Sequence, residues 1–186
     1  MSVGYFADTR LPLLVVASSN HSTTWIVDPQ LGSIFRPAAV FGSSAIIAID
    51  SVCDDTQCYI VTVAPPEPVA IPGQIIIWGT SSNGKPSRLQ RIAVAEPMDV
   101  KFLRLPNGRL ALAVLQCSGI DNVMVYVLKG LSQFEHVTTI HVPGAVDLQV
   151  VADEAQVLMA LTINQSSEDG SNAVRVFRAR FLDLLA

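Results

Sequence analysis

The chain has 186 residues, of which 50% are hydrophobic and 15% are charged, and its formal net charge is −4. This large apolar share excludes a disordered chain, because so many hydrophobic side chains need a core to cover them. The 12 Lys and Arg residues are scattered, and no apolar run is long enough for a membrane-spanning helix, so the sequence predicts neither nucleic-acid binding nor a membrane span.

Along the chain, short apolar runs rich in β-branched residues alternate with Gly, Pro, Asn, Asp and Ser, a pattern typical of antiparallel strands. The first set of four runs is predicted at 13–19, 23–28, 34–41 and 45–50. The second set is predicted at 58–64, 74–80, 88–95 and 98–105, with a proline-rich insert at 65–72. The third is predicted at 109–116, 122–129, 134–142 and 145–152, and a partial fourth at 158–162 and 173–180.

The second and third sets are copies of each other at a spacing of 48 residues. Trp78 matches Tyr126 at this spacing, and Asp99 matches Asp147. We therefore divide a single segment, 1–186, into repeats at about 13–52, 58–105, 109–152 and 156–186, the last being partial. An isolated meander of four strands exposes two apolar faces, and radial stacking of copies buries them. The predicted fold class is all-β, a β-propeller-like array of four-stranded antiparallel blades.

About three full blades and partial ones are predicted, with 3–7 as the last strand of a preceding blade. Propellers usually close on about 4 to 8 blades, so we expect an incomplete ring. The chain is then either a piece of a longer polypeptide or completes its ring with further blades from a partner. The turn Pro106-Asn107-Gly108 is predicted to join successive units.

One aromatic residue occupies the same place in every copy, and we predict that it packs between blades. These residues are Trp25, Trp78, Tyr126 and Phe177. The recurrent Asp99 and Asp147 are predicted to cap turns or to accept backbone N–H groups rather than to bind a metal.

The sequence has three cysteines, and Cys53 and Cys58 flank a short turn. They are candidates for a local disulfide, and the alternative is two free, small apolar side chains. Two sequons, at Asn20 and Asn164, are candidates for N-glycosylation because both lie in the loop after the first predicted strand of a copy, although two such motifs also arise by chance.

Several packing positions of the repeat carry a family resemblance. Val125-Tyr126, Phe134, Ile140, the segment 143–148 and the segment 157–160 resemble the epilepsy-associated repeat, also called EAR or EPTP. The resemblance covers about the last two thirds of the chain, and the preceding copy departs from it with Pro97-Met98 in place of Gly-Ala. It implies a secreted or cell-surface seven-bladed propeller that binds other proteins without catalysis.

No phosphate-binding loop, nucleophile elbow or zinc-type spacing occurs in the sequence, and His136 and His141 fall on opposite faces of one predicted strand. We therefore predict no catalytic residue, no metal and no cofactor. The expected function is a non-catalytic protein–protein interaction module, a fragment of an extracellular or cell-surface EAR-type propeller that binds receptor or matrix proteins. The alternatives are an intracellular WD40-like scaffold and a metal-dependent propeller hydrolase, whose ligands would converge from several blades on a central channel.

Overall fold

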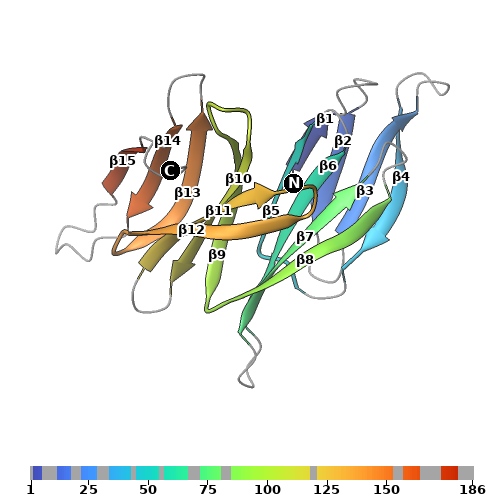
Figure 1. Ribbon diagram of the computed structural model, residues 1–186. Helices are drawn as coiled ribbons and strands as arrows, with labels where there is room; N and C mark the ends of the chain where they lie inside the picture. The colour runs from blue at the N-terminus through green and yellow to red at the C-terminus, as the bar shows by residue number, and fades with distance from the viewer. Residues whose placement is uncertain are drawn as a thin grey trace. The chain divides into compact units, whose positions relative to one another are not determined.

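The computed structural model of the chain describes residues 2–5, 12–17, 22–28, 34–42, 45–54, 57–66, 72–80, 85–117, 121–152, 157–163 and 173–179. Within these ranges every regular element is a β-strand, which confirms the all-β prediction (Figure 1). A helix suited to crossing a membrane is not found among the residues described. The chain divides into two compact units, residues 1–93 and 94–186.

The described residues of the first unit form two antiparallel sheets of four strands, and the strands of each sheet are consecutive in the chain. One sheet has the order β1 (Ser2–Tyr5), β2 (Pro12–Ala17), β3 (Ser22–Asp28) and β4 (Ile34–Phe41). The other has the order β5 (Ala48–Cys53), β6 (Cys58–Ala64), β7 (Gly73–Thr80) and β8 (Pro86–Val94). The first strands of the two sheets, β1 and β5, lie side by side.

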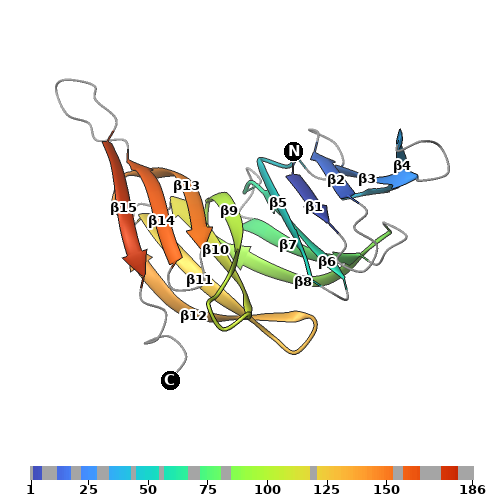
Figure 2. The ribbon, with the colours of Figure 1, turned by 90° about the horizontal axis from the view of Figure 1, so that it is seen from above.

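In the second unit, the described residues repeat this arrangement with seven strands in two sheets. A four-stranded sheet contains β9 (Pro97–Arg104), β10 (Leu110–Cys117), β11 (Asp121–Lys129) and β12 (Gln133–His141). A three-stranded sheet contains β13 (Ala145–Ala152), β14 (Val157–Ile163) and β15 (Ala173–Ala179), and Figure 2 shows it beside the first. Here too the first strands, β9 and β13, are neighbours.

Each sheet begins one strand earlier than the sequence repeat predicted. The prediction placed 98–105 at the end of a blade, but β9 instead begins the next sheet by pairing with β10. The turn Pro106-Asn107-Gly108 therefore lies inside a sheet, where the N–H of Gly108 donates to the carbonyl of Leu105 at 2.8 Å. For the same reason β1 opens the first sheet and does not end a preceding one. A periodic sequence gives the spacing of copies but not the strand at which a sheet starts.

The core of each unit lies between its two sheets. In the first unit, Leu13 and Val15 from β2 and Phe41 from β4 pack with Cys58 and Ile60 from β6. In the second unit the cluster is larger, and alternate residues of β10, β11, β13 and β14 meet in it. Its fully buried members include Ala113, Leu115, Val125, Leu148 and Leu161. Stacking of sheets, as the repeat predicted, is what buries the apolar side chains within each unit.

Candidate functional site

In the second unit, the first strand of each sheet carries a β-bulge near its start. In β9, Pro97 pairs with Gln116 and Asp99 with Leu115, so Met98 is the extra residue. A bulge turns the side chains next to it away from the regular alternation of a strand, and bulges are frequent beside active sites. Met98 is 43% exposed despite its apolar side chain.

The bulge recurs at the equivalent place in β13. Ala145 pairs with Ile163 and Asp147 with Thr162, which makes Val146 the extra residue. Val146 is 41% exposed. The two neighbouring strands therefore each present an exposed apolar residue followed directly by an aspartate.

Asp99 lies in a partly buried position between the two sheets, and its side chain is 13% exposed. Oδ1 accepts the backbone N–H of Val100 at 2.8 Å and the ammonium of Lys101 at 3.1 Å. Oδ2 accepts the backbone N–H of Leu148, on β13, at 3.4 Å. The carboxyl group thus links the first strands of adjacent sheets, in agreement with the predicted role of accepting backbone N–H groups.

Burial raises the pKa of the Asp99 carboxyl group above its ordinary value, because the charged form loses contact with water. The charge of Lys101 and the hydrogen bonds from Lys101, Val100 and Leu148 oppose this rise without cancelling it. A carboxyl group that keeps its proton to higher pH than usual is the kind of group that serves as a general acid.

Asp147, the residue before Leu148, is exposed. It follows the bulge in β13 as Asp99 follows the bulge in β9. The pair therefore combines a partly buried carboxyl group and a water-exposed one on adjacent strands. That difference in environment is a common way to give two carboxyl groups different chemical roles.

Glu96 precedes this site in a strained conformation. Its φ is 46°, in the left-handed region that non-glycine residues rarely adopt, and its carbonyl accepts the backbone N–H of Cys117 at 3.0 Å. The equivalent residue before β13 is Gly144, whose φ is 78°. Sequence reasoning missed Glu96, although the match of Glu96 with Gly144 at the 48-residue spacing was a signal for it. Strained non-glycine residues cluster at functional sites.

The recurrent aromatic residues all occupy the third strand of a sheet, opposite an apolar residue of the second strand. The opposed pairs are Trp25 with Leu14, Trp78 with Ile60, Tyr126 with Leu112 and Phe177 with Met159. Trp78 packs between two sheets, with its ring centroid 5.0 Å from that of Phe41 in β4. Tyr126 is buried, and its ring meets the imidazole of His136 edge-on at 5.4 Å.

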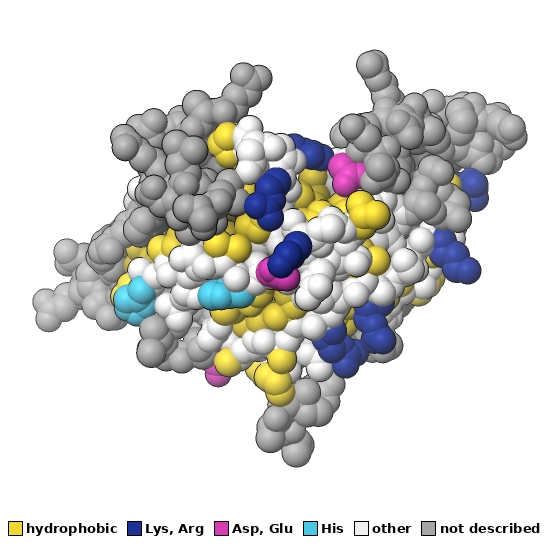
Figure 3. All heavy atoms as spheres, viewed as in Figure 1, with side chains coloured by type: hydrophobic (Ala, Val, Ile, Leu, Met, Phe, Trp, Pro, Cys, Tyr) yellow, Lys and Arg dark blue, Asp and Glu magenta, His cyan; other side chains and the backbone are white. Residues whose placement is uncertain are grey.

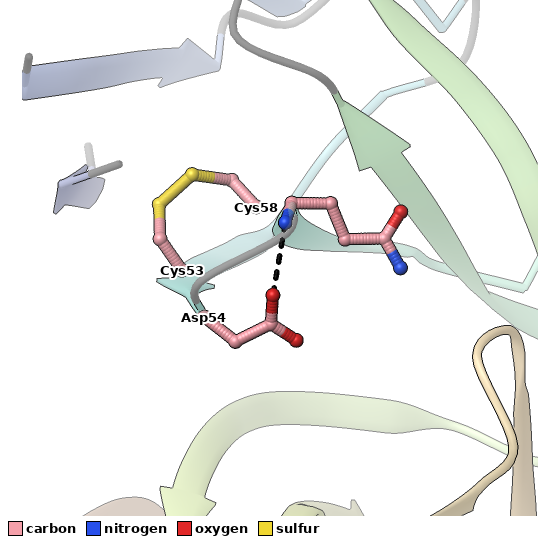
Figure 4. The surroundings of a disulfide bond; sticks show 4 residues. Cys53, Asp54 and Cys58 are labelled. Carbon is pink, nitrogen blue, oxygen red and sulfur yellow. Dashed lines mark hydrogen bonds between the residues drawn. A yellow bond between two sulfur atoms is a disulfide. The ribbon is translucent and has the colours of Figure 1, made fainter. Parts of the chain in front are cut away.

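Cys53 and Cys58 form a disulfide across the turn from β5 to β6 (Figure 4). The same turn is held by a hydrogen bond from the backbone N–H of Gln57 to Oδ1 of Asp54 at 2.9 Å. The bridge therefore closes the hairpin at the position where the sequence placed a candidate pair. Cys117 is not part of a disulfide, and its Sγ donates a hydrogen bond to the carbonyl oxygen of Ala145 at 3.2 Å.

The other sequence candidates do not join the site. Asn20 and Asn164 lie outside the described residues. His136 contacts Thr139 at 2.9 Å, and His141 contacts Asn122 at 3.2 Å. In the described part of the chain, no three His, Cys, Asp or Glu residues are placed to hold a metal ion. On the face in Figure 3, Lys and Arg side chains lie among polar and hydrophobic surface.

The fold is similar to that of several enzymes. A thermostable family-43 glycoside hydrolase matches with a TM-score of 0.62 at 12% identity, over 96% of this chain and 68% of that one. Kuenenia stuttgartiensis hydrazine synthase matches with a TM-score of 0.60 at 15% identity, over 96% of this chain and 51% of that one. Sucrose-6-phosphate hydrolase from Lactobacillus gasseri matches with a TM-score of 0.53 at 10% identity, over 90% of this chain and 43% of that one. No protein-family model and no curated protein matches the sequence.

These similarities confirm the predicted fold class, a β-propeller-like array of four-stranded antiparallel blades. They contradict the prediction of a non-catalytic interaction module, and with it the prediction that the chain is not an enzyme, because a glycoside hydrolase and a sucrose-6-phosphate hydrolase are among them. That prediction treated the absence of local sequence motifs as evidence against catalysis. Side chains that converge from separate blades can form a catalytic site without any local motif.

Proposed function

We propose that this chain carries part of the active site of a propeller that hydrolyses glycosidic bonds. The observation that carries the proposal is the pair of bulged first strands, which place a carboxyl group of raised pKa, Asp99, next to the strand that bears the exposed Asp147. The fold shared with a family-43 glycoside hydrolase and a sucrose-6-phosphate hydrolase supports it.

Most glycoside hydrolases need two carboxyl groups with different protonation states. One donates a proton to the oxygen of the leaving sugar, and a raised pKa keeps that proton available. Asp99 fits this role because burial favours its protonated form. Asp147, which is exposed, fits the role of the second carboxyl group, which attacks the sugar or activates a water molecule.

Two further features suit a sugar ligand. Met98 and Val146 are exposed apolar residues directly before the two aspartates, and mixed apolar and polar lining is typical of small-molecule sites. Lys101 is a positioning residue in this proposal: its ammonium holds Oδ1 of Asp99 at 3.1 Å and leaves Oδ2 with a single, longer hydrogen bond from Leu148.

The test is release of nitrophenol from a panel of nitrophenyl glycosides, and of reducing sugar from sucrose and sucrose-6-phosphate. We expect Asp99→Asn and Asp147→Asn each to lower kcat/KM by about 100-fold or more, the usual contribution of an acid or base group. Glu135→Gln is the matched control, because Glu135 is an exposed carboxylate on β12 that pairs with Lys129 at 3.0 Å. Absence of hydrolysis across the panel, or equal activity of Asp99→Asn and Glu135→Gln, would refute the proposal.

We also propose that the protein is a secreted or cell-surface glycoprotein. The Cys53–Cys58 disulfide supports this, because disulfides persist in oxidising compartments. The sequons at Asn20 and Asn164 support it as well. Treatment of protein from a eukaryotic secretory host with an N-glycosidase should lower its mass, and an unchanged mass would contradict the glycoprotein assignment.

A further inference from the structure

Glu96 combines a fixed backbone with an open side chain, three residues before Asp99. Its carbonyl oxygen accepts the backbone N–H of Cys117 at 3.0 Å, and the next residue, Pro97, is buried. The Glu96 side chain is exposed, and it forms no hydrogen bond or ion pair with another described residue. The backbone thus holds this carboxyl group close to the start of β9, where a ligand can reach it.

The fold itself does not require a glutamate at this position. The left-handed φ of 46° has a steric cost for any side chain, and glycine avoids that cost. The equivalent residue before β13 is Gly144, with φ 78°. Each of the two residues lies two positions before the extra residue of a bulge, Met98 in β9 and Val146 in β13. Because the same turn forms with glycine, a function of the Glu96 side chain is what accounts for the cost.

The basic residues of the second unit lie away from the two bulges. Among the side chains described there, the nearest Lys or Arg along β9 is Lys101, and its ammonium lies 3.1 Å from Oδ1 of Asp99. The others lie at the opposite end of the sheet, about 20 Å along an extended strand: Arg104, Arg109 and Lys129. A phosphate group beside the bulges would therefore meet, among these described side chains, only a lysine that is already paired.

An acidic side chain suits a different ligand group. Carboxyl oxygens accept hydrogen bonds, and two of them can accept from the hydroxyl groups that sugars carry on neighbouring carbons. On the basis of the glycosidase function proposed above, we propose that Glu96 determines specificity at the same site by binding two hydroxyl groups of an uncharged sugar. Met98, which is 43% exposed, offers an apolar contact to the ring of that sugar. The site then selects neutral sugars over sugars that carry phosphate.

The test compares sucrose with sucrose-6-phosphate, and nitrophenyl glycosides with their 6-phosphates. We expect the wild type to have a kcat/KM about 10-fold or more higher for the neutral member of a pair. Glu96→Gln and Glu96→Gly should raise KM for the neutral substrate by about 10-fold and leave kcat within about twofold, because they remove binding that the ground state and the transition state share. Glu96→Lys should lower KM for the phosphorylated substrate and reverse the preference.

Glu135→Lys is the matched control for Glu96→Lys, because it makes the same substitution at a surface carboxyl group near the other end of the sheet, beside Lys129. It should keep the preference of the wild type. Glu96→Gly relieves the backbone cost, so a raised KM in this variant reports a lost contact and not lost folding.

Two failures of the test can be told apart. A wild type that hydrolyses neither member of any pair overturns the proposed glycosidase function and this inference with it. A wild type that hydrolyses sugars but prefers the phosphorylated ones overturns this inference alone. The same holds for an active wild type whose KM and preference the Glu96 variants do not alter.

Discussion

The indole ring of Trp78 meets the ring of Phe41 edge-on, with the centroids 5.0 Å apart and the planes at 70°. The same indole donates its Nε1–H to Oγ1 of Thr62 at 3.2 Å. The ring of Trp78 thus packs one sheet against another, and its Nε1–H forms a hydrogen bond within its own sheet. These two contributions can be separated by substitution.

Trp78→Phe should keep most of the ring contact with Phe41 and lose the hydrogen bond to Thr62. The expected loss in free energy of unfolding is about 1 kcal/mol, because the hydroxyl of buried Thr62 also donates to the carbonyl of Ile76 at 3.5 Å and keeps one partner. Trp78→Ala should cost about 3 kcal/mol, since it removes the ring as well. Urea denaturation measures both values, and equal losses for the two variants would show that the ring contact does not contribute.

The Cys53–Cys58 disulfide closes a short loop, because the two residues are five apart in sequence. Replacing both by alanine should lower the free energy of unfolding by about 2 kcal/mol, less than a bridge across a long loop would. The measurement is denaturation of the double variant beside the wild type with and without reductant. Reductant should lower the free energy of unfolding of the wild type but not that of the double variant. An equal response of both proteins would contradict a structural role for the bridge.

Glu96→Gly should raise the free energy of unfolding by up to about 1 kcal/mol, because glycine adopts the left-handed conformation at φ 46° without a steric penalty but loses more freedom on folding. If the Glu96 side chain contributes to the active site, the same variant should lose glycosidase activity. Gly144→Ala is the control at the equivalent position, and it should destabilise the protein by about 1 kcal/mol or more. A destabilised Glu96→Gly would show that no strain is relieved there.

The raised pKa of Asp99 predicts a specific pH dependence of stability. Between the pKa of this group in the unfolded chain and its higher pKa in the folded chain, the folded state binds more protons. The contribution of Asp99 to the free energy of unfolding therefore falls as pH rises through that interval and is constant above it. Asp99→Asn should remove this fall, whereas Asp147→Asn should retain it. Denaturation of the three proteins at a series of pH values tests the difference.

The strands and their stacking were predictable from the sequence, because apolar alternation and a 48-residue repeat depend on the residues alone. The recurrence of one aromatic residue was visible in the sequence for the same reason, and its predicted packing between sheets is seen at Trp78. The strand at which each sheet starts was not predictable. β9 pairs with β10 through a tight turn, and the sequence of such a turn does not tell whether it joins two sheets or two strands of the same sheet. Hydrogen bonding across strands decides that question.

The candidate site was only partly predictable. Asp99 and Asp147 were visible as a recurrent pair, and acceptance of backbone N–H groups was anticipated for them. The raised pKa of Asp99 depends on burial between two sheets and on the N–H of Leu148, 49 residues away in sequence. The strain at Glu96 likewise depends on a backbone angle. Neither property is encoded in a local motif.

Every sheet in the described part of this chain consists of strands that are consecutive in sequence, each paired with its neighbour through a short connection. The loops that must close for a sheet to form are therefore short, and their entropic cost is low. During synthesis, a sheet can be completed once its last strand has left the ribosome, without waiting for distant segments. The order of folding should then follow the order of translation, with the second sheet of each unit condensing on the first sheet of that unit.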